Sequence, residues 1–343
     1  MSRHAALRVG ILGCAHSHAA GYARCLAQIE GAELAGLYDE ERARADQIAS
    51  AYGLRAEKSV EALLAKVDAV VVASENARSS SLVEAGASAG RPVLCEKPLG
   101  VSRKDSERML EACASSGVSL GVSFPVRYSP AVIRLRELVS GGELGSTLSV
   151  WATNHGSFPG GWFGDPALSG GGSLIDHVVH VADLLRWVWG AEPISVFAEA
   201  AARHHGGISV EDAGLLLVTM DNATIVSLDA SWSRHRGMPG AVDVTMIVTM
   251  DGGEISLDAL SARVEHIAAD GRLSFAGVGE DLDRLLLEDW IEAVRLGGPA
   301  PVPGEDGMRA SALAWAALES ARTYQTVHLP AVGVHGRAGS CGA

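Results

Sequence analysis

Residues 7–18 read LRVGILGCAHSH and place a short apolar run directly before a loop and a helical pattern. The same alternation continues to residue 122. We predict strands at 7–12, 34–38, 67–73, 92–95 and 119–122, and helices at 19–29, 40–52, 79–89 and 102–116. Strands that alternate with helices form parallel βαβ units, and a run such as AVVVA at 69–73 suits a strand covered on both faces. Residues 1–123 are therefore predicted to form a doubly wound α/β domain.

From residue 147 onward the pattern changes, because strand candidates follow one another with few helices between them. We predict strands at 147–153, 194–200, 214–220, 224–228, 242–250, 254–257 and 263–267, and helices at 174–189, 282–296 and 307–323. Asp221-Asn222 and Asp251-Gly252-Gly253 have the chemistry of hairpin turns. This pattern predicts a second α+β domain, residues 124–330, built on a largely antiparallel sheet. We expect the small, Gly-rich residues 331–343 to be a flexible tail.

Composition narrows the class of protein. The 343 residues are 48% hydrophobic and 20% charged, as in an ordinary globular protein, and the formal net charge is −13. That charge would repel phosphate backbones, so we expect no nucleic-acid partner. The five scattered cysteines form no Cys-x-x-Cys pair, which favours free thiols in the reducing cytoplasm. No uncharged apolar run approaches the ~18 residues of a membrane span.

The loop that follows the first strand lies where a dinucleotide pyrophosphate would meet the N–H groups of a helix. The glycine fingerprint of such loops expects three glycines, and here Ala15 and His18 replace two of them. An ordinary β–α turn is the alternative. Asp39 ends the second predicted strand, near the position of the acid that holds a ribose hydroxyl and repels a 2′-phosphate. It could also cap the next helix. The pattern favours NAD over NADP, bound by Gly13, Cys14, Ala15, His16, Ser17, His18 and Asp39.

Two further motifs carry the chemistry of a proton and hydride transfer. The tripeptide Glu96-Lys97-Pro98 follows a strand at the sheet edge where doubly wound folds bind ligands. Residues 170–180 read GGGSLIDHVVH and place Asp176 and His180 at i and i+4, on one helix face. A carboxylate beside an imidazole suits a general base, and Lys97 would stabilise a developing alkoxide. The alternatives are a plain capping box for Asp176 and a solvated loop lysine.

The order of these motifs resembles the glucose–fructose oxidoreductase/inositol dehydrogenase (Gfo/Idh/MocA) family, over about residues 7–325. Members share a Glu-Lys-Pro motif and a Gly-rich helix start bearing Asp-x-x-x-His. FPVRYSP at 124–130 also resembles the family's segment leading into the second domain. The resemblance implies a Rossmann domain, with Lys97, Asp176 and His180 as catalytic residues. It also implies Arg127 near the substrate, and Ser74, Asn76, Glu96 and Lys97 near the cofactor.

The chain departs from the family pattern at two places. The glycine fingerprint is reduced to Gly13-Cys14-Ala15-His16-Ser17-His18, and Ser74-Glu75 stands where Thr-Pro usually precedes Asn76. Both departures bear on how the cofactor lies rather than on the catalytic residues.

His155 and His177 raise the possibility of a metal, because they could act as ligands together with Asp176 and His180. His177, however, projects ~100° away from the helix face that the other two share. We therefore expect no metal there, and expect His155 and His177 to hydrogen-bond substrate hydroxyls. Trp162, in the aromatic Gly/Pro-rich segment 156–166, is expected to stack on a sugar ring; a local hydrophobic cluster is the alternative.

The function that these residues predict is oxidation of a secondary alcohol on a cyclic polyol, sugar or sugar derivative by NAD. His180, oriented by Asp176, would take the hydroxyl proton while Lys97 polarises the oxygen. One alternative is a sugar-processing enzyme that retains its NAD through oxidation, elimination and reduction; another is a catalytically silent sugar-binding regulator. Because the resemblance implies sheets packed face to face between subunits, we expect a homodimer or homotetramer joined through the second domain.

Overall fold

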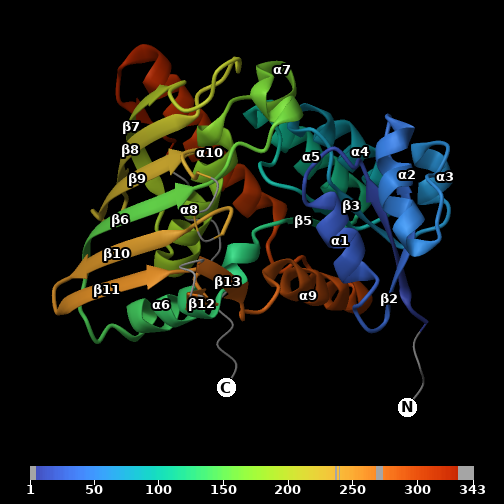
Figure 1. Ribbon diagram of the computed structural model, residues 1–343, viewed down its shortest axis with the longest axis horizontal. Helices are drawn as coiled ribbons and strands as arrows, with labels where there is room; N and C mark the ends of the chain where they lie inside the picture. Colours follow the sequence, from blue (N-terminus) through green and yellow to red (C-terminus); the bar gives the residue numbers. More distant parts are fainter. Residues whose placement is uncertain (1–4, 236–237, 239, 268–272, 331–343) are drawn as a thin grey trace.

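The computed structural model describes residues 5–235, 238, 240–267 and 273–330 (Figure 1). Its first sheet is parallel, in the order β2-β1-β3-β4-β5. The strands are β1 Leu7–Leu12, β2 Ala32–Tyr38, β3 Ala69–Val72, β4 Val93–Cys95 and β5 Leu120–Val122. The helices are α1 Ala19–Leu26, α2 Arg42–Ala49, α3 Val60–Leu64, α4 Ser79–Ser88 and α5 Arg103–Ser116. All four residues of β3 are buried, as expected for a strand with helices on both faces.

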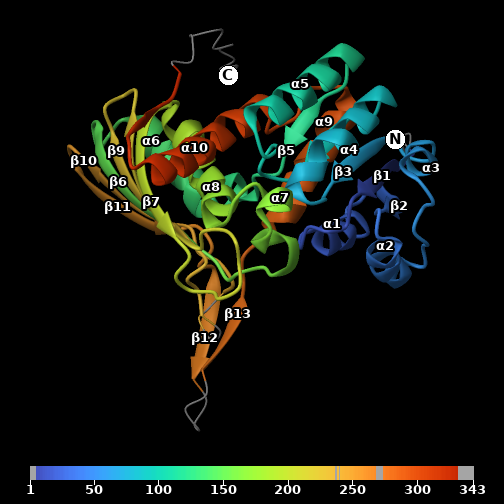
Figure 2. The ribbon, with the colours of Figure 1, turned by 90° about the horizontal axis from the view of Figure 1, so that it is seen from above.

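The second sheet has seven strands, in the order β11-β10-β6-β9-β8-β7-β14, and only the β6–β9 pair is parallel. Its strands are β6 Thr147–His155, β7 Pro193–Ala201, β8 Ala213–Met220, β9 Ile225–Ser231, β10 Thr245–Met250, β11 Gly253–Asp258 and β14 Val327–His328. Helices α8 Ser173–Trp189 and α10 Gly304–Thr323 cover one face of this sheet, and the other face carries no helix in the described part (Figure 2). The predicted fold class, a Rossmann domain followed by an α+β domain on a largely antiparallel sheet, is confirmed.

Several elements differ from the sequence prediction. Helix α6 Pro130–Gly141 and the short helix α3 were not predicted, nor was the second strand of the hairpin β12 Arg263–Ile267 and β13 Leu273–Gly277. This hairpin projects from the body of the molecule (Figure 2). The remaining elements are the short helices η1 Ser50–Tyr52, η2 Asn76–Arg78, η3 Pro125–Tyr128, η4 Gly161–Gly164 and α7 Pro166–Ser169. The predicted tail, 331–343, lies outside the described residues.

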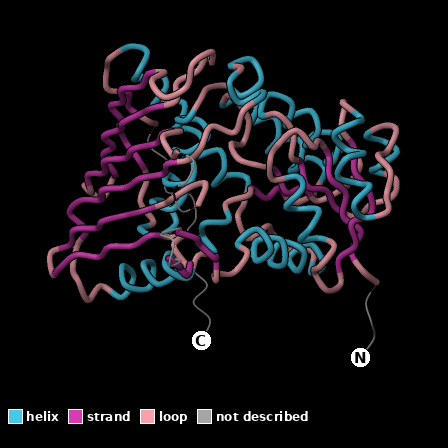
Figure 3. The backbone as a smooth tube through the Cα atoms, in the orientation of Figure 1, coloured by secondary structure: helices cyan, strands magenta, loops and turns pink. Residues whose placement is uncertain are grey.

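Helix α9, Leu282–Leu296, follows the second sheet in the chain but packs on the first domain (Figure 3). Its buried residues Leu287 and Trp290 belong to the same core as Val9 and Leu26, and α9 contacts α1. An isolated bridge between Gly121 and Pro303 brings the chain back to the edge of the first sheet. The C-terminal part of the chain therefore completes both domains.

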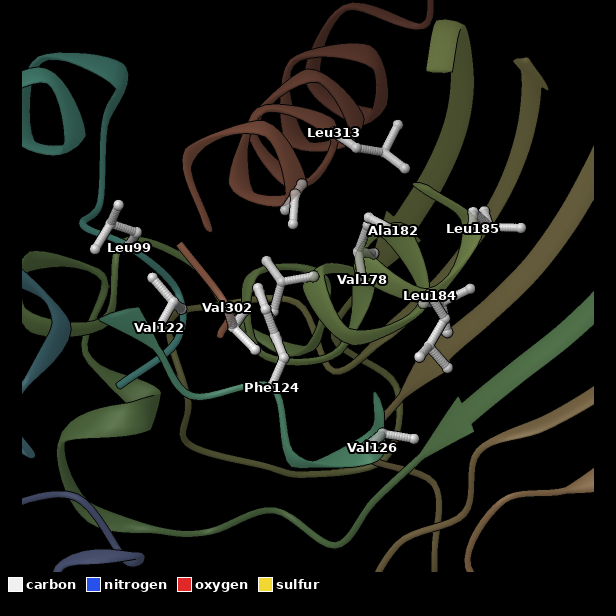
Figure 4. Packing of buried hydrophobic residues seen from close by; sticks show 14 of the residues in the cluster. Leu99, Val122, Phe124, Val126, Val178, Ala182, Leu184, Leu185, Val302 and Leu313 are labelled. Carbon is white, nitrogen blue, oxygen red and sulfur yellow. The ribbon is translucent and has the colours of Figure 1, made fainter. Parts of the chain in front are cut away.

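A second core joins the two sheets. Figure 4 shows Val122 from β5, Phe124, Val178 from α8 and Leu313 from α10 together in this cluster. Each of these side chains is at most 1% exposed. Because the core is continuous from the end of the first sheet to α8, the residues at the end of β4 are held in a fixed position against α8. Within the described chain, no helix is long and apolar enough to cross a membrane.

Candidate functional site

A cavity of about 540 Å³ opens where the carboxyl end of the first sheet meets α8 and the segment after β6. The loop after β1, the end of β4, the first turns of α8 and the start of α9 all contribute to its wall. The polar lining residues are His16, Ser17, His18, Lys97, Asn154, Ser157, Asp176, His177, His180, Asp281 and Asp283. The cavity therefore brings the three predicted catalytic residues together with part of the predicted phosphate loop.

Lys97 and Asp176 form a buried ion pair at the centre of this wall. The ammonium Nζ of Lys97 donates to Oδ1 of Asp176 at 2.6 Å, and the two residues are 4% and 8% exposed. The indole N–H of Trp232 donates to the other carboxylate oxygen at 3.0 Å. Burial alone would raise the pKa of Asp176, but the charge of Lys97 and the contacts with His177 hold that pKa well below its usual value. Asp176 is therefore an anion that fixes Lys97 in place.

His180 lies one helical turn after Asp176, and no ion pair joins it to a carboxylate of the described residues. Its Nδ1 is buried without a hydrogen-bond partner among the described residues, and its ring meets Phe124 edge-on. Burial, and next the charge of Lys97, lower the pKa of His180 well below its ordinary value. The imidazole is thus neutral near pH 7 and able to accept a proton.

The structure corrects one detail of this constellation. We expected Asp176 to orient His180, but the carboxylate oxygens are taken by Lys97, Trp232 and the neighbouring His177. The i, i+4 spacing brings the two residues to the same cavity without a hydrogen bond between them. His180 is instead positioned by packing.

His177 lines the cavity, as expected, although its helix face differs from that of Asp176. Its Nδ1 donates to the carbonyl oxygen of Asn154 at 2.8 Å, and its Nε2 lies 3.3 Å from the Asp176 carboxylate. Gly156 permits this approach, because a Cβ atom there would lie 2.6 Å from the His177 ring. His177 therefore supports Asp176 from the side of β6.

Three of the four residues predicted to bind substrate, Arg127, His155 and Trp162, do not line the cavity. Arg127 is buried in an ion-pair network with Asp183 of α8 and Asp306 of α10. The ring of His155 lies between Asp243 and Asp229, at 3.0 Å and 3.2 Å, and shares the helix-free face of the second sheet with Thr153. The ligand set considered for a metal, which included His155, is thus not brought together.

Trp162, in the segment after β6, contacts the predicted phosphate loop. Its indole N–H donates to the carbonyl oxygen of Ala15 at 3.0 Å, and its ring stacks on Phe163. The ring of His16 lies 6.1 Å from that of Trp162, centroid to centroid. Trp162 therefore ties the second domain to the loop after β1.

The loop itself has the features that a dinucleotide needs. Gly13 has φ +80°, and a Cβ atom there would lie 2.5 Å from that of Ser74, so this position requires glycine. Asp39 accepts hydrogen bonds from the backbone N–H groups of Cys14 and Glu41 at 2.6 Å and 2.7 Å. A carboxylate has about four lone-pair sites, so Asp39 keeps capacity for a ribose hydroxyl.

Two other residues expected near the cofactor are engaged elsewhere. The amide Nδ2 of Asn76 donates to the carbonyl oxygen of Ser169 in α7 at 2.9 Å. The hydroxyl of Ser74 donates to the carbonyl oxygen of Glu75 at 3.1 Å. Asn76 thus fixes α7, and with it the start of the Gly-rich segment before α8.

Glu96 has a network of its own beneath the cavity. Its Oε1 accepts from the Tyr22 hydroxyl and lies 2.9 Å from Nδ1 of His18, and its Oε2 accepts from the Lys97 backbone N–H at 3.0 Å. Burial would raise the pKa of Glu96, but His16, His18 and Lys97 lower it far below its usual range. Burial lowers the pKa of His16 to about 3, so this ring is neutral.

Sequence reasoning missed Tyr22, Asn154, Trp232 and Asp283, which complete the cavity and its support. Tyr22 stands one turn after His18 on α1, a spacing that could have been noticed. Trp232 and Asp283 reach the site only through the tertiary fold, and no local signal marks them.

Comparison with known proteins identifies the family of the chain. Residues 7–124 match the oxidoreductase family with an NAD-binding Rossmann fold, and residues 132–256 match the GFO/IDH/MocA C-terminal domain. The chain belongs to the Gfo/Idh/MocA family. Within the family, the chain is 30% identical over 325 residues to inositol 2-dehydrogenase 4 of Saccharopolyspora erythraea, which covers 89% of this chain and 90% of that protein. It is 28% identical over 321 residues to D-apiose dehydrogenase of Paraburkholderia graminis, covering 88% and 84% of the two chains.

Solved structures of other Gfo/Idh/MocA-like proteins share the architecture. GenD2 from gentamicin A biosynthesis, in complex with NAD, superposes with a TM-score of 0.85 at 25% identity and covers 96% of this chain and 98% of its own. A probable dehydrogenase from Thermotoga maritima gives 0.80 at 27% identity, with 94% and 98% covered.

Proposed function

We propose that this chain is an NAD-dependent dehydrogenase that oxidises a secondary alcohol on a cyclic polyol, sugar or sugar derivative. The observation that carries the proposal is the convergence of Lys97, Asp176 and neutral His180 on one cavity that the loop after β1 also lines. A base without a proton and a fixed ammonium group are what removal of a hydroxyl proton requires.

Each residue then has one task. NAD, when bound, supplies the hydride acceptor, and Gly13 to His18 and Asp39 would hold it. His180 takes the proton of the substrate hydroxyl at its ring nitrogen. Lys97 stabilises the negative charge that develops on the oxygen, while Asp176 keeps Nζ in position. His177 holds Asp176 from the side, and Asn154, whose Oδ1 has no hydrogen-bond partner among the described residues, is placed to accept from a neighbouring hydroxyl.

The substrate class follows from the lining and from the relatives. Lys97 is the only lysine or arginine that lines the cavity in the described structure, and it is already paired with Asp176. Such a wall favours a neutral, hydroxyl-rich molecule over a phosphorylated or carboxylated one. The relatives named inositol 2-dehydrogenase and D-apiose dehydrogenase fit the same class.

NAD is the proposed cofactor in preference to NADP. The buried carboxylate of Asp39 would accept from a ribose hydroxyl and repel a 2′-phosphate. Arg44 lies 3.8 Å from Asp39, but it also pairs with Glu41 and Glu75, which offset its charge. Replacing Asp39 with Ala should therefore narrow the preference for NAD over NADP roughly 10- to 150-fold. This is the effect of losing one charge-assisted hydrogen bond of about 1.5–3 kcal/mol.

Two further properties belong to this proposal. We expect a homodimer or homotetramer, because the helix-free face of the second sheet exposes apolar side chains such as Trp151, Leu215 and Leu217. We also expect the protein to work in the cytoplasm, since Cys14, Cys25, Cys95 and Cys113 are all free thiols.

A panel of polyols and aldoses, followed by NADH absorbance with NAD and NADP in parallel, tests the proposal. Steady release of NADH with at least one cyclic polyol or sugar would support it. Conversion of a glycoside without net NADH would point instead to an enzyme that retains its cofactor. Binding without either reaction would point to a silent regulator.

A further inference from the structure

Two histidines of the loop after β1, which belong to the segment proposed to hold NAD, take no part in the proposed proton transfer. His18 stands where the dinucleotide fingerprint expects its last glycine, and His16 lies two residues before it. Both rings line the cavity, and both turn toward the carboxylate of Glu96 at the end of β4. A small residue would satisfy the backbone of this loop equally well, so the pair of imidazoles calls for a ligand.

The three side chains are close enough to share one ion. Nδ1 of His18 lies 2.9 Å from Oε1 of Glu96, and Nδ1 of His16 lies 3.8 Å from the same oxygen. The ligand atoms that the three residues offer all lie within 4.8 Å of one another. Ligands of a tetrahedral zinc ion, bound at about 2.0–2.1 Å, lie roughly 3.3 Å apart, between the two distances measured to Glu96.

We propose that His16, His18 and Glu96 form a binding site for one divalent transition-metal ion, such as Zn²⁺ or Co²⁺. Imidazole and carboxylate ligands suit these ions, whereas Mg²⁺ and Ca²⁺ prefer oxygen ligands alone. The site differs in all its members from the set of Asp176, His177, His180 and His155.

The surroundings of the cluster favour a cation. Glu96 is 2% exposed, and its second oxygen is held by the backbone N–H of Lys97, as the outer contacts of a metal ligand often are. The ring of His16 is 3% exposed, and its Nδ1, which accepts the backbone N–H of His18, is the unprotonated nitrogen that a metal ion could take.

Binding would exchange weak contacts for ligand bonds. Nδ1 of His16 now accepts a hydrogen bond of 3.2 Å from the backbone N–H of His18, and Nδ1–H of His18 donates to the Glu96 carboxylate. The ion would replace both, while the hydrogen bond from Tyr22 to Glu96 could remain. Three protein ligands leave a fourth position open toward the cavity, so the ion would add positive charge to the wall that carries Lys97.

The full-length protein, stripped with a chelator and dialysed, can be titrated with Co²⁺ and followed by visible absorption. We expect one equivalent to bind and to give the bands of a site with nitrogen and oxygen ligands. His18→Ala and Glu96→Gln should each weaken binding at least about tenfold, since even the outer contacts of metal ligands are worth that much. Circular dichroism and thermal unfolding of each variant check that it is folded.

His155→Ala is the matched control, because His155 also lies between carboxylates but is on the second sheet, whereas His16, His18 and Glu96 are on the first domain. It should bind Co²⁺ as the wild type does. The proposal is overturned if the wild type binds no stoichiometric Co²⁺ or Zn²⁺, if His18→Ala binds as tightly as the wild type, or if only His155→Ala loses the ion. The titration uses the metal alone, so its result does not depend on dehydrogenase activity.

Discussion

Lys97 and His180 act on the same hydroxyl group, but Lys97 is charged and His180 is neutral. This difference determines what each residue can do in the site. Lys97 is held by the Asp176 carboxylate, whereas His180 forms no ion pair with a carboxylate of the described residues and lies near the ammonium group of Lys97, which lowers its pKa. One residue can therefore stabilise negative charge while the other accepts a proton.

Replacing either residue should reduce turnover without abolishing cofactor binding. We expect Lys97→Ala and His180→Ala each to lower kcat at least about 100-fold, the lower range for a positioned acid–base group. NAD titration by protein fluorescence should give a Kd close to that of the wild type. A His180→Ala enzyme with near-normal kcat would show that His180 only packs the site.

The lowered pKa of His180 also sets the pH dependence. A general base must be unprotonated, and the pKa of His180 lies well below the ordinary 6.5, so kcat/KM should fall only on the acid side of that value. In Lys97→Ala the burial of His180 persists but the neighbouring positive charge is gone, so the acid limb should move to higher pH. Profiles of kcat/KM against pH for the wild type and Lys97→Ala measure this shift. An acid limb at the same pH in both proteins would contradict the prediction.

Sequence spacing could place Lys97, Asp176 and His180 in one cavity, because two of them share a helix face and the third ends a parallel strand. It could not predict their partners. Trp232 and His177 take the Asp176 carboxylate through contacts that depend on how β6 and β9 cross α8. Likewise, Arg127 was expected near the substrate, and only the packing of α8 against α10 assigns it other neighbours.

At the scale of elements, Arg127 joins η3 to two helices of the second domain. Its guanidinium donates to Asp183 of α8, which is 0% exposed, and to Asp306 of α10. Arg127→Met should lower the free energy of unfolding by about 3–5 kcal/mol, because it leaves a buried carboxylate unpaired. Denaturant unfolding measures the loss.

The same variant tests the role that the sequence suggested. Since Arg127 does not line the cavity, the folded fraction of Arg127→Met should keep a KM within a few-fold of the wild type. Arg127→Met combined with Asp183→Leu, which removes both charges, should recover part of the stability. A large rise in KM with unchanged stability would instead place Arg127 in contact with the substrate.

His155 ties β6 to β9 and to the segment that leads into β10. Hydrogen bonds to Asp229 and Asp243 raise its pKa from 6.5 to about 9. Because the folded pKa exceeds the unfolded one, the stabilisation is complete below pH 6.5 and is lost as the pH rises through about 9. Between these limits the wild type should lose about 1–3 kcal/mol more unfolding free energy than His155→Gln, which does not titrate. Parallel curves of stability against pH for the two proteins would rule this out.

Most helices and strands could be predicted from the sequence, and those that were not predicted have physical reasons. Helix α6 carries Val132 and Leu135 on its buried side, which is a helical spacing. This short pattern directly follows the motif at 124–130 and was not assigned to a helix. Strand β14 has two residues and exists only because β7 offers a free edge. Helix α9 was located correctly, but nothing in its own sequence says that it packs on α1.

For the whole molecule, we expect the helix-free face of the second sheet to decide the state of assembly. Met246, Val248 and Met250 of β10 are buried beneath the helices, so Thr245, Ile247 and Thr249 belong to the helix-free face. Pairing aligns Ile247, Trp151, Ser227, Leu217 and Phe197 in one row across five strands of that face. Trp151 and Leu217 are 58% and 53% exposed there.

An apolar row of this kind, flanked by polar residues, has the composition of an interface core with its rim. We therefore expect sedimentation at micromolar concentration to show a species larger than the 35.6 kDa chain. Trp151→Glu and Leu217→Glu should each shift the distribution toward the monomer, because a buried interface would then contain an unpaired charge. Leu296→Glu, at a residue 76% exposed on α9, is the control and should leave assembly unchanged. A wild-type protein that sediments only as a 35.6 kDa species would show that this face is not an interface between copies of the chain.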